Sequence, residues 1–317
     1  MAADLLISVV VPSTLRPSLG RTLQSVAAQD WSGRLEVILV IDLDAETHPV
    51  GVPNDFPFAM TILFTGGRRG GASARNMGVD AAEGDYIAFL DDDDLWEPNK
   101  LSSQMSLLRA ELHEDRDRPV IVSSQIRHQR DDLLDDSVIP KRLIEPDERV
   151  EEYLFRGRTP SNRRQSLYTS TLLVSAELAR SVRWDETLTR HQDWDWLISA
   201  QRLGGARIFQ VREPLVRIVV GSTGSISGGS DWESSLAWLQ RQREWSRQAQ
   251  ADFLAAQTLR YALQARSWPG VFSTIRALSM SKRLPSAGPA LIALAGALPR
   301  HTLNKVLVRN RRATSVR

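Results

Sequence analysis

A short apolar run followed by four consecutive aspartates limits what this 317-residue chain can fold into. Residues 86–90 read Tyr-Ile-Ala-Phe-Leu, a β-prone run of the kind that lies buried in a parallel sheet. It ends directly at the aspartates of positions 91–94. Ligands of open α/β sheets bind beyond the carboxyl ends of the strands, so the acidic run falls where a site is expected. Adjacent carboxylates repel one another and favour a cation such as Mg²⁺ or Mn²⁺.

The sequence just upstream of this strand is rich in glycine and arginine. Glycine permits close backbone approach, and arginine supplies forked donors for phosphate. The residues concerned are Gly66, Gly67, Arg68, Arg69, Gly70, Gly71 and Arg75. By composition alone, an aspartate run is more often a solvated turn or helix cap, but a solvated turn needs no such upstream segment. The combination predicts a site for a metal ion and a diphosphate.

Three further apolar runs, at residues 5–11, 35–41 and 61–65, precede this strand and are separated by stretches such as 19–29 with helical periodicity. This order predicts an α/β fold with a parallel, right-handed, doubly wound sheet. Ser13, Thr14, Asp42 and Asp44 follow the first two runs and would lie at the same edge as the aspartates. Asp42 alone is equally explained as a turn residue.

Residues 71–78 (GASARNMG) and 84–94 (GDYIAFLDDDD) resemble the central signature of family 2 glycosyltransferases, which have the Rossmann-like GT-A fold. The agreement in residue type and spacing extends over about 25 positions. The resemblance implies a DxD motif at Asp91 and Asp93, in which Asp91 contacts the sugar nucleotide and Asp93 the divalent cation, with Asp91 as a further metal ligand. It places Arg75 near the nucleotide sugar.

The resemblance also assigns the remaining donor contacts. Family members hold the nucleoside with a polar pair after the first strand and an aspartate after the second. The usual Asp-Asp-Gly-Ser pattern is replaced here by Asp-Leu-Asp-Ala at 42–45, and of the two aspartates we favour Asp42. The expected nucleotide-sugar contacts are Pro12, Ser13, Thr14, Arg16, Asp42, Arg75, Asp91 and Asp92.

A second stretch with chemical character is WDETLTRHQDWDWL at 184–197. Inverting sugar transfer needs one carboxylate to take the acceptor proton, while a metal offsets the charge of the leaving diphosphate. The family places this base in an acidic pair before an aromatic-rich helix, so the resemblance implies Asp193, with Gln192 where glutamate is common. Asp193 and Asp195 would also suit the first turn of a helix as dipole partners. His191 is expected either to pack or to orient a substrate.

Two family features are missing from the sequence. Many members have a metal-binding histidine after a late strand, whereas residues 214–222 contain none. Serine, water or phosphate oxygen would then complete the metal shell, or the metal would bind weakly until the nucleotide arrives. The Gln-x-x-Arg-Trp sequence of processive members is also absent, since residues 201–203 read Gln-Arg-Leu. We therefore expect the transfer of a single sugar.

The charge balance changes near residue 230. Residues 231–317 contain 14 Lys/Arg and 4 Asp/Glu, a net charge of +10, which leaves −8 for residues 1–230. We expect a GT-A catalytic domain at 1–230 and a basic helical region at 231–317, with the Gly- and Ser-rich run 222–230 as a linker or lid. The apolar segment 284–299, bordered by basic residues, suits peripheral contact with an anionic membrane. Packing on the catalytic domain or in a homodimer is the alternative, and a tail without interleaved aromatics does not favour nucleic acid.

Composition also excludes several classes of protein. The absence of cysteine removes disulfides, thiolate catalysis and Cys-based zinc sites. The N-terminus has the character of a strand rather than a signal peptide, and no apolar run reaches the ~18–20 residues that span a bilayer. The expected location is cytoplasmic, at the inner face of the plasma membrane.

The expected function is that of an inverting, metal-dependent, hexosyltransferase-type glycosyltransferase. It would move one sugar from a nucleoside diphosphate sugar to a glycan or lipid-linked acceptor hydroxyl in bacterial polysaccharide synthesis. One alternative is a sugar-1-phosphate nucleotidyltransferase, but residues 12–16 do not form the Gly-rich basic loop that it would need. The other is a catalytically silent sugar-nucleotide-binding scaffold, against which the intact acidic set argues.

Overall fold

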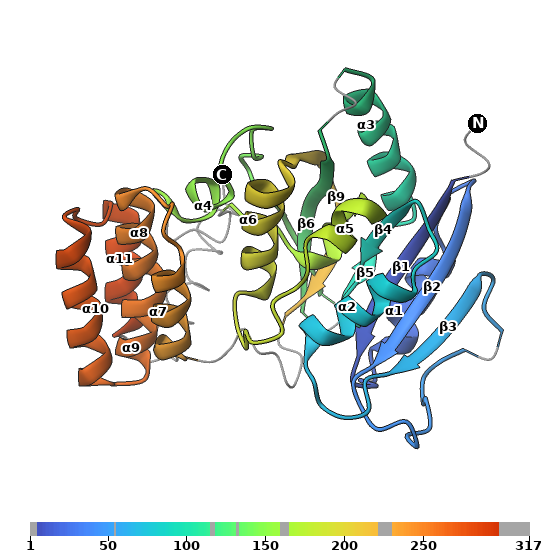
Figure 1. The fold of residues 1–317 in the computed structure, drawn as a ribbon, viewed down its shortest axis with the longest axis horizontal. Coiled ribbons are helices and arrows are strands. Elements are labelled where there is room, and N and C mark those ends of the chain that lie inside the picture. Colours follow the sequence, from blue (N-terminus) through green and yellow to red (C-terminus); the bar gives the residue numbers. More distant parts are fainter. Residues whose placement is uncertain are drawn as a thin grey trace. The chain divides into compact units, whose positions relative to one another are not determined.

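The computed structural model describes residues 5–53, 55–114, 118–130, 133–158, 165–220 and 230–297. The chain forms two compact units (Figure 1): Met1–Val150 with Gln165–Ser225, and Glu151–Arg164 with Ile226–Arg317. The first unit contains the sheet, and the second is helical. Helix α4 (Val150–Phe155) lies almost wholly in the second unit, although the sequence was expected to divide only near residue 230.

The sheet unit is built on a mostly parallel sheet of nine strands within the described residues. Its strand order is β3-β2-β1-β4-β8-β6-β9-β5, and β7 pairs with β6. The pairs β1–β2, β1–β4, β2–β3 and β6–β9 are parallel, and β5, β7 and β8 pair antiparallel. The strands are β1 (Leu6–Ser13), β2 (Arg34–Ile41), β3 (Ala59–Phe64), β4 (Tyr86–Phe89), β5 (Leu95–Trp96), β6 (Val120–Arg130), β7 (Leu133–Ile139), β8 (Leu173–Ser175) and β9 (Arg207–Val219).

Helices cover both faces of this sheet because successive strand residues point to opposite sides. Helices α1 (Leu19–Ala27) and α3 (Lys100–Glu114) pack on the face that carries Val9 and Val37. Helix α2 (Gly71–Ala81) packs on the other face, where a Cβ added at Gly78 would overlap Val10. Helices α5 (Ala176–Ser181) and α6 (Gln192–Gly204) complete this second layer.

The predicted α/β fold class and mostly parallel sheet are confirmed. Residues directly after the aspartates form a short strand before any helix, since 95–96 are β5, which pairs with β9, and α3 begins only at Lys100. The acidic segment 127–149 contains the end of β6 and the strand β7 paired with it. The short strand β8 is preceded by the 3₁₀ turn η1 (Thr169–Thr171).

The helical unit gathers its helices around an aromatic cluster of Phe155, Trp238, Trp245 and Phe253. Its elements after α4 are α7 (Trp232–Arg241), α8 (Arg247–Phe253), the π-helical segment η3 (Leu254–Leu259), α9 (Arg260–Gln264), α10 (Trp268–Ser281) and α11 (Ala287–Gly296). Of the helices in the described part of the chain, none is both long and apolar enough to cross a bilayer.

Candidate active site

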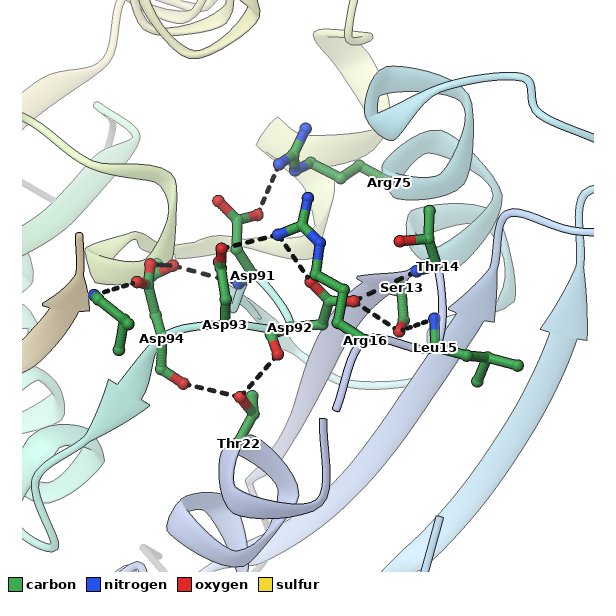
Figure 2. Close-up of polar contacts among 12 residues, drawn as sticks. Ser13, Thr14, Leu15, Arg16, Thr22, Arg75, Asp91, Asp92, Asp93 and Asp94 are labelled. Atoms are coloured by element: carbon green, nitrogen blue, oxygen red, sulfur yellow. Dashed lines mark hydrogen bonds and ion pairs between the residues drawn. The ribbon is translucent and has the colours of Figure 1, made fainter. Parts of the chain in front are cut away.

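The register of the sheet brings Ser13 beside Asp92. Val10 of β1 pairs with Phe89 of β4, so continuing both strands by three residues places Ser13 level with Asp92. The Ser13 hydroxyl donates to Asp92 Oδ2 at 2.7 Å, and the Thr14 N–H donates to the same oxygen at 3.2 Å (Figure 2). Burial raises the pKa of Asp92, and the hydrogen bond from Ser13 opposes this shift. Asp92 therefore connects the ends of two adjacent strands.

Arg16 reaches the same turn from the segment that follows β1. Its guanidinium lies 2.7 Å from Asp93 and 3.3 Å from Asp92 (Figure 2). Leu15, which directly precedes it, has a left-handed backbone with φ 59°, a conformation that non-glycine residues rarely adopt. Pro12 is the last but one residue of β1 and is half-buried. Arg16, expected at the nucleotide sugar, is thus paired with the carboxylate expected at the metal.

Asp94 holds the aspartate turn to the rest of the unit. Its two carboxylate oxygens accept from the Ser170 hydroxyl at 2.5 Å and the Val219 N–H at 3.2 Å. Burial raises the pKa of Asp94 well above its ordinary value, and the charges of Asp91 and Asp93 raise it further. Ser170 also accepts from the Asp91 N–H at 3.1 Å. Asp94 is therefore a structural member of the turn.

Thr22 of α1 contacts the backbone of the same turn. Its hydroxyl lies 3.0 Å from the Asp92 carbonyl and 2.9 Å from the Asp94 carbonyl (Figure 2). Sequence reasoning assigned no role to Thr22 or Ser170 and treated Asp94 only as part of the acidic run. No local pattern marks Thr22 or Ser170, because both contact the turn across 70 or more positions of sequence.

Arg75 of α2 connects the two stretches that the sequence singled out. Its Nη2 lies 2.6 Å from Asp91 Oδ1, and its Nη1 donates to Gln192 Oε1 at 3.3 Å. The guanidinium carbon is 4.8 Å from the centre of the Trp184 ring, so an aromatic face supports it. Asn76 donates to the Trp184 carbonyl at 2.9 Å and accepts from its N–H at 3.0 Å. Asn76 thereby fixes the segment that leads into α6, and Arg75 connects the start of α6 to Asp91. We call residues 91–94 the DxD turn, after the motif predicted there.

Asp193 lies in the first turn of α6, next to Gln192. Removal of its carboxyl group from water raises the pKa of Asp193 to about 6, although part of the residue remains accessible. The Trp194 N–H and the positive charge of Arg75 oppose this shift, and the negative charge of Asp91 adds to it. The expected base therefore shares an electrostatic environment with Asp91, the first aspartate of the predicted DxD motif.

His191 directly precedes this first turn. Its backbone is left-handed, with φ 62°, and its ring stacks on Trp194 with the ring centres 4.7 Å apart. The residue is buried, so the stacking holds the start of α6 in place. Backbone strain of this kind is common at functional sites.

Asp42 shapes the loop that leads into α2. One carboxylate oxygen accepts from the Thr65 hydroxyl at 2.7 Å and the Arg69 N–H at 2.8 Å, and the other accepts from the Gly70 N–H at 2.9 Å. Asp44, the other aspartate of this segment, is exposed. The structure thus gives Asp42 a loop-holding role, and a contact of Asp42 with the nucleoside stays a prediction.

The carboxylates at the DxD turn do not form a closed metal centre. Within the described residues, no group of three or more His, Cys, Asp or Glu side chains could hold a metal ion. Asp91 and Asp93 offer hard oxygen donors, but each is ion-paired with an arginine. Such a donor set fits a cation whose shell is completed by phosphate oxygens and water. The predicted lid at 222–230 lies outside the described residues, except for Ser230.

A separate cavity of about 350 Å³ lies at the opposite edge of the sheet. It is lined by residues at the amino ends of β4 and β6, including Tyr86 and Val120, and by Ser175 of β8. None of the predicted site residues lines it. The chemistry-bearing side chains gather at the carboxyl ends of the parallel strands.

Comparison with known sequences identifies relatives of this chain. The model of the family "Glycosyl transferase family 2" matches residues 8–153. The amylovoran biosynthesis glycosyltransferase AmsB of Erwinia amylovora is 32% identical over 242 residues, which cover 74% of this chain and 77% of AmsB. The UDP-Glc:alpha-D-GlcNAc-diphosphoundecaprenol beta-1,3-glucosyltransferase WfgD of Escherichia coli is 33% identical over 111 residues, covering 33% of this chain and 42% of WfgD.

Solved structures share the fold at low sequence identity. Residues 1–349 of TarS from S. aureus, in complex with UDP-GlcNAc, match with a TM-score of 0.63 and 16% identity, over 92% of this chain and 88% of that chain. The mannosyltransferase PcManGT from Pyrobaculum calidifontis, in complex with GDP-Man and Mn²⁺, matches with a TM-score of 0.50 and 19% identity, over 93% and 80%. AmsB, the sequence relative, is named as a glycosyltransferase, and TarS, the structural neighbour, was solved with the sugar nucleotide UDP-GlcNAc. The chain belongs to glycosyltransferase family 2, has the GT-A fold and is a glycosyltransferase.

Proposed function

We propose that this glycosyltransferase transfers one sugar, with inversion, from a nucleoside diphosphate sugar to an acceptor hydroxyl. The observation that supports the proposal is the pair of contacts made by Arg75, which joins Asp91 to Gln192, the neighbour of Asp193, together with the influence of the Asp91 charge on the Asp193 carboxyl. A carboxylate near a cation-binding acidic turn is what an inverting transfer requires.

Asp193 is the general base in this mechanism. With its pKa raised to about 6, Asp193 is mostly ionised at neutral pH and is a stronger base than an ordinary aspartate. It accepts the proton of the acceptor hydroxyl while the hydroxyl oxygen bonds to the anomeric carbon. The bond from that carbon to the diphosphate oxygen breaks, and the nucleoside diphosphate leaves with the electron pair.

A divalent cation, Mn²⁺ or Mg²⁺, would be held by Asp91 and Asp93 together with the diphosphate of the donor. When bound, it offsets the negative charge that develops on the leaving diphosphate. Asp93 would exchange its ion pair with Arg16 for the cation, which leaves the Arg16 guanidinium to contact phosphate. The complex of PcManGT with GDP-Man and Mn²⁺ supports this assignment.

Residues at the ends of β1 and β2 and in the turn after β4 would hold the remainder of the donor. We assign nucleoside or sugar contacts to Pro12, Ser13, Thr14, Asp42 and Asp92. The UDP-GlcNAc bound to TarS supports a nucleotide-sugar donor. The names of AmsB and WfgD support an acceptor in bacterial polysaccharide synthesis, and for WfgD a diphosphoundecaprenol-linked sugar. We accordingly place the reaction in the cytoplasm at the plasma membrane, with the catalytic domain at 1–230 and the basic helical region at 231–317.

Ligand-induced thermal stabilisation of the full chain tests the donor site. UDP-, GDP- and dTDP-sugars are screened with Mn²⁺, Mg²⁺ or a chelator, for the wild type, Asp93→Asn and the control Asp44→Asn. At about 100 times its Kd, a donor should raise Tm by about 5 °C, because only the folded state binds it. We expect this shift with metal in the wild type and the control, and not in Asp93→Asn. A screen in which no donor gives a metal-dependent shift would contradict the proposal.

The products formed distinguish the transferase from its alternatives. The wild type should release nucleoside diphosphate from the bound donor slowly with water and faster with an acceptor, whereas Asp193→Asn should bind donor and release none. Formation of pyrophosphate from a nucleoside triphosphate and a sugar-1-phosphate would identify a nucleotidyltransferase instead. Donor binding without any release by the wild type would identify a scaffold.

A further inference from the structure

Helix α10 turns its large apolar side chains outward and its small ones inward. Trp268, Phe272 and Ile275 recur at helical spacing on one face, and each is more than half exposed. The buried positions of the same helix are Gly270, Thr274 and Ser281. An ordinary surface helix of a globular protein has the reverse arrangement.

Helix α11 has the same inverted pattern. Leu291 and Leu294 are more than half exposed, whereas Pro289, Ala293 and Gly296 are buried. Met280 near the end of α10 and Leu284 between the two helices are also exposed, and Leu284 reaches 86%. We call these apolar side chains the α10–α11 surface: Trp268, Phe272, Ile275, Met280, Leu284, Leu291 and Leu294. They are seven of the eleven large apolar residues exposed in the described part of the chain.

The packing of the helical unit explains why the small residues face inward. A Cβ added at Gly270 would lie 2.7 Å from the Trp232 ring, and one added at Gly296 would lie 2.7 Å from the Arg260 carbonyl oxygen. Both helices therefore approach their neighbours too closely for larger side chains. The large apolar side chains of each helix face away from this contact. Trp268, Phe272 and Ile275 form one exposed apolar stripe along α10, and exposed apolar surface of this kind marks an interaction site.

The positive charge of this region indicates which class of partner it binds. After Asp252 the chain contains no acidic residue, and residues 253–317 contain 11 Lys/Arg. Arg276, Lys282 and Arg283 are exposed within or next to the α10–α11 surface. Two copies docked through this surface would bring like charges together without any carboxylate from the segment. An anionic bilayer instead offers apolar chains beneath a layer of phosphates.

We propose that the α10–α11 surface docks the chain on an anionic lipid bilayer. The apolar side chains enter the boundary between headgroups and acyl chains, and Arg276, Lys282 and Arg283 contact lipid phosphates. Helices of this length lie in the plane of the interface, in agreement with the lack of a spanning helix among the described residues. The surface would hold the enzyme where a lipid-linked acceptor is found.

Sedimentation of the full chain with lipid vesicles tests the docking without any sugar nucleotide. Vesicles of phosphatidylcholine are compared with vesicles containing about 30% phosphatidylglycerol. Binding should require the anionic lipid and weaken between about 0.1 M and about 0.5 M salt. Replacing Trp268, Phe272 and Ile275 together by serine should weaken binding at least tenfold, because three large side chains no longer leave water.

A second variant and a control separate docking from a folding defect. Charge reversal at Arg276, Lys282 and Arg283 should weaken binding by about fivefold or more for each residue, because each contact with an anionic surface is worth roughly that factor. The control, Leu133→Ser with Leu203→Ser, removes two exposed apolar side chains of the sheet unit and should bind as the wild type does. Circular dichroism and thermal unfolding show whether each variant is folded.

Three results would overturn the proposal. The first is equal binding of the wild type to neutral and anionic vesicles, and the second is an equal loss in the control. The third is a concentration-dependent dimer in sedimentation velocity that the triple serine variant disperses, because a second copy of the chain would then cover the surface. None of these measurements depends on sugar transfer. They therefore test the membrane-docking proposal independently of the proposed reaction.

Discussion

The guanidinium of Arg75 lies 2.6 Å from a carboxylate oxygen of Asp91, and this ion pair lies at the centre of the candidate site. The Arg75 side chain is 10% exposed and the Asp91 side chain 34%, so water reaches this pair mainly from the Asp91 side. The same guanidinium reaches Gln192, the neighbour of Asp193. One side chain of α2 thus joins the end of β4 to the start of α6.

Replacing Arg75 should disable transfer more than it disturbs the fold. Arg75→Met removes the donors to Asp91 and Gln192, and we expect kcat/KM to fall about a hundredfold, the cost of removing one preorganised donor from an active site. Arg75→Lys keeps the charge without the fork and should be intermediate. Steady-state kinetics measure the effect, with Arg34→Met as the control, because Arg34 is an exposed arginine at the amino end of β2, at the edge of the sheet opposite the site. Wild-type kinetics in a folded Arg75→Met protein would remove this residue from the site.

The rate of transfer should depend on pH through Asp193. Because the base must be ionised and its pKa is raised to about 6, kcat/KM should fall tenfold per pH unit below about 6 and level off above it. The Asp91 charge raises this pKa, so Asp91→Asn should move the acidic limb of the residual rate to lower pH. A limb in the usual aspartate range near pH 4 would show that Asp193 is not the titrating base.

Asp193→Asn should abolish transfer and at the same time stabilise the folded protein. The pKa of Asp193 is higher in the folded protein than in the unfolded chain, so the folded state binds more protons between pH 3.8 and about 6. Its stability therefore falls as pH rises through this window, and the ionised carboxylate costs about 3 kcal/mol above it. Thermal unfolding at pH about 8 should give a higher Tm for Asp193→Asn than for wild type, and the difference should vanish near pH 4. Asp195→Asn, another first-turn acid, is the control and should not stabilise.

Asp42 and Asp44 should differ in their effect on stability. Asp42→Ala leaves the Thr65 hydroxyl and the Arg69 and Gly70 N–H groups without their acceptor, and we expect a loss of about 2–4 kcal/mol in the free energy of unfolding. Asp44→Ala changes an exposed residue and should stay within about 0.5 kcal/mol. Urea unfolding measures both. Equal effects would mean that the loop does not depend on the Asp42 carboxylate.

Lys100 is a buried lysine that has no role in the proposed mechanism. Its Nζ has no hydrogen-bond partner among the described residues and lies 3.8 Å from the centre of the Trp96 ring. Burial lowers the pKa of Lys100 well below its ordinary value, so the unfolded chain binds more protons and stability rises with pH. Because a cation–π contact is worth only about 0.5–2 kcal/mol, we expect desolvation to dominate. Lys100→Met should raise Tm at pH about 7, and by less near pH 10; a lower Tm would mean that the contact with Trp96 prevails.

Local patterns in the sequence were sufficient to predict the strands and the helix that lie on either side of the site. β1, β2 and β4 appear as apolar runs that end in polar residues, and α2 follows the Gly- and Arg-rich loop. The strands β5 and β7 could not be read in this way. Each forms only because a partner lies beside it, β9 for the first and β6 for the second. Pairing between strands depends on the path of the whole chain, which a local pattern does not contain.

The sequence by itself determined which groups are present and at which strand ends they lie. The resemblance to family 2 glycosyltransferases then selected Asp91, Asp93 and Asp193 as the predicted site acids, because residue type and spacing are local properties. Only the tertiary structure decided that Arg75 joins Asp91 to a residue 117 positions from Arg75, and that the Asp193 carboxyl is removed from water. Those two properties arise from packing between distant segments, because burial and the charges nearby exist only once the chain has folded.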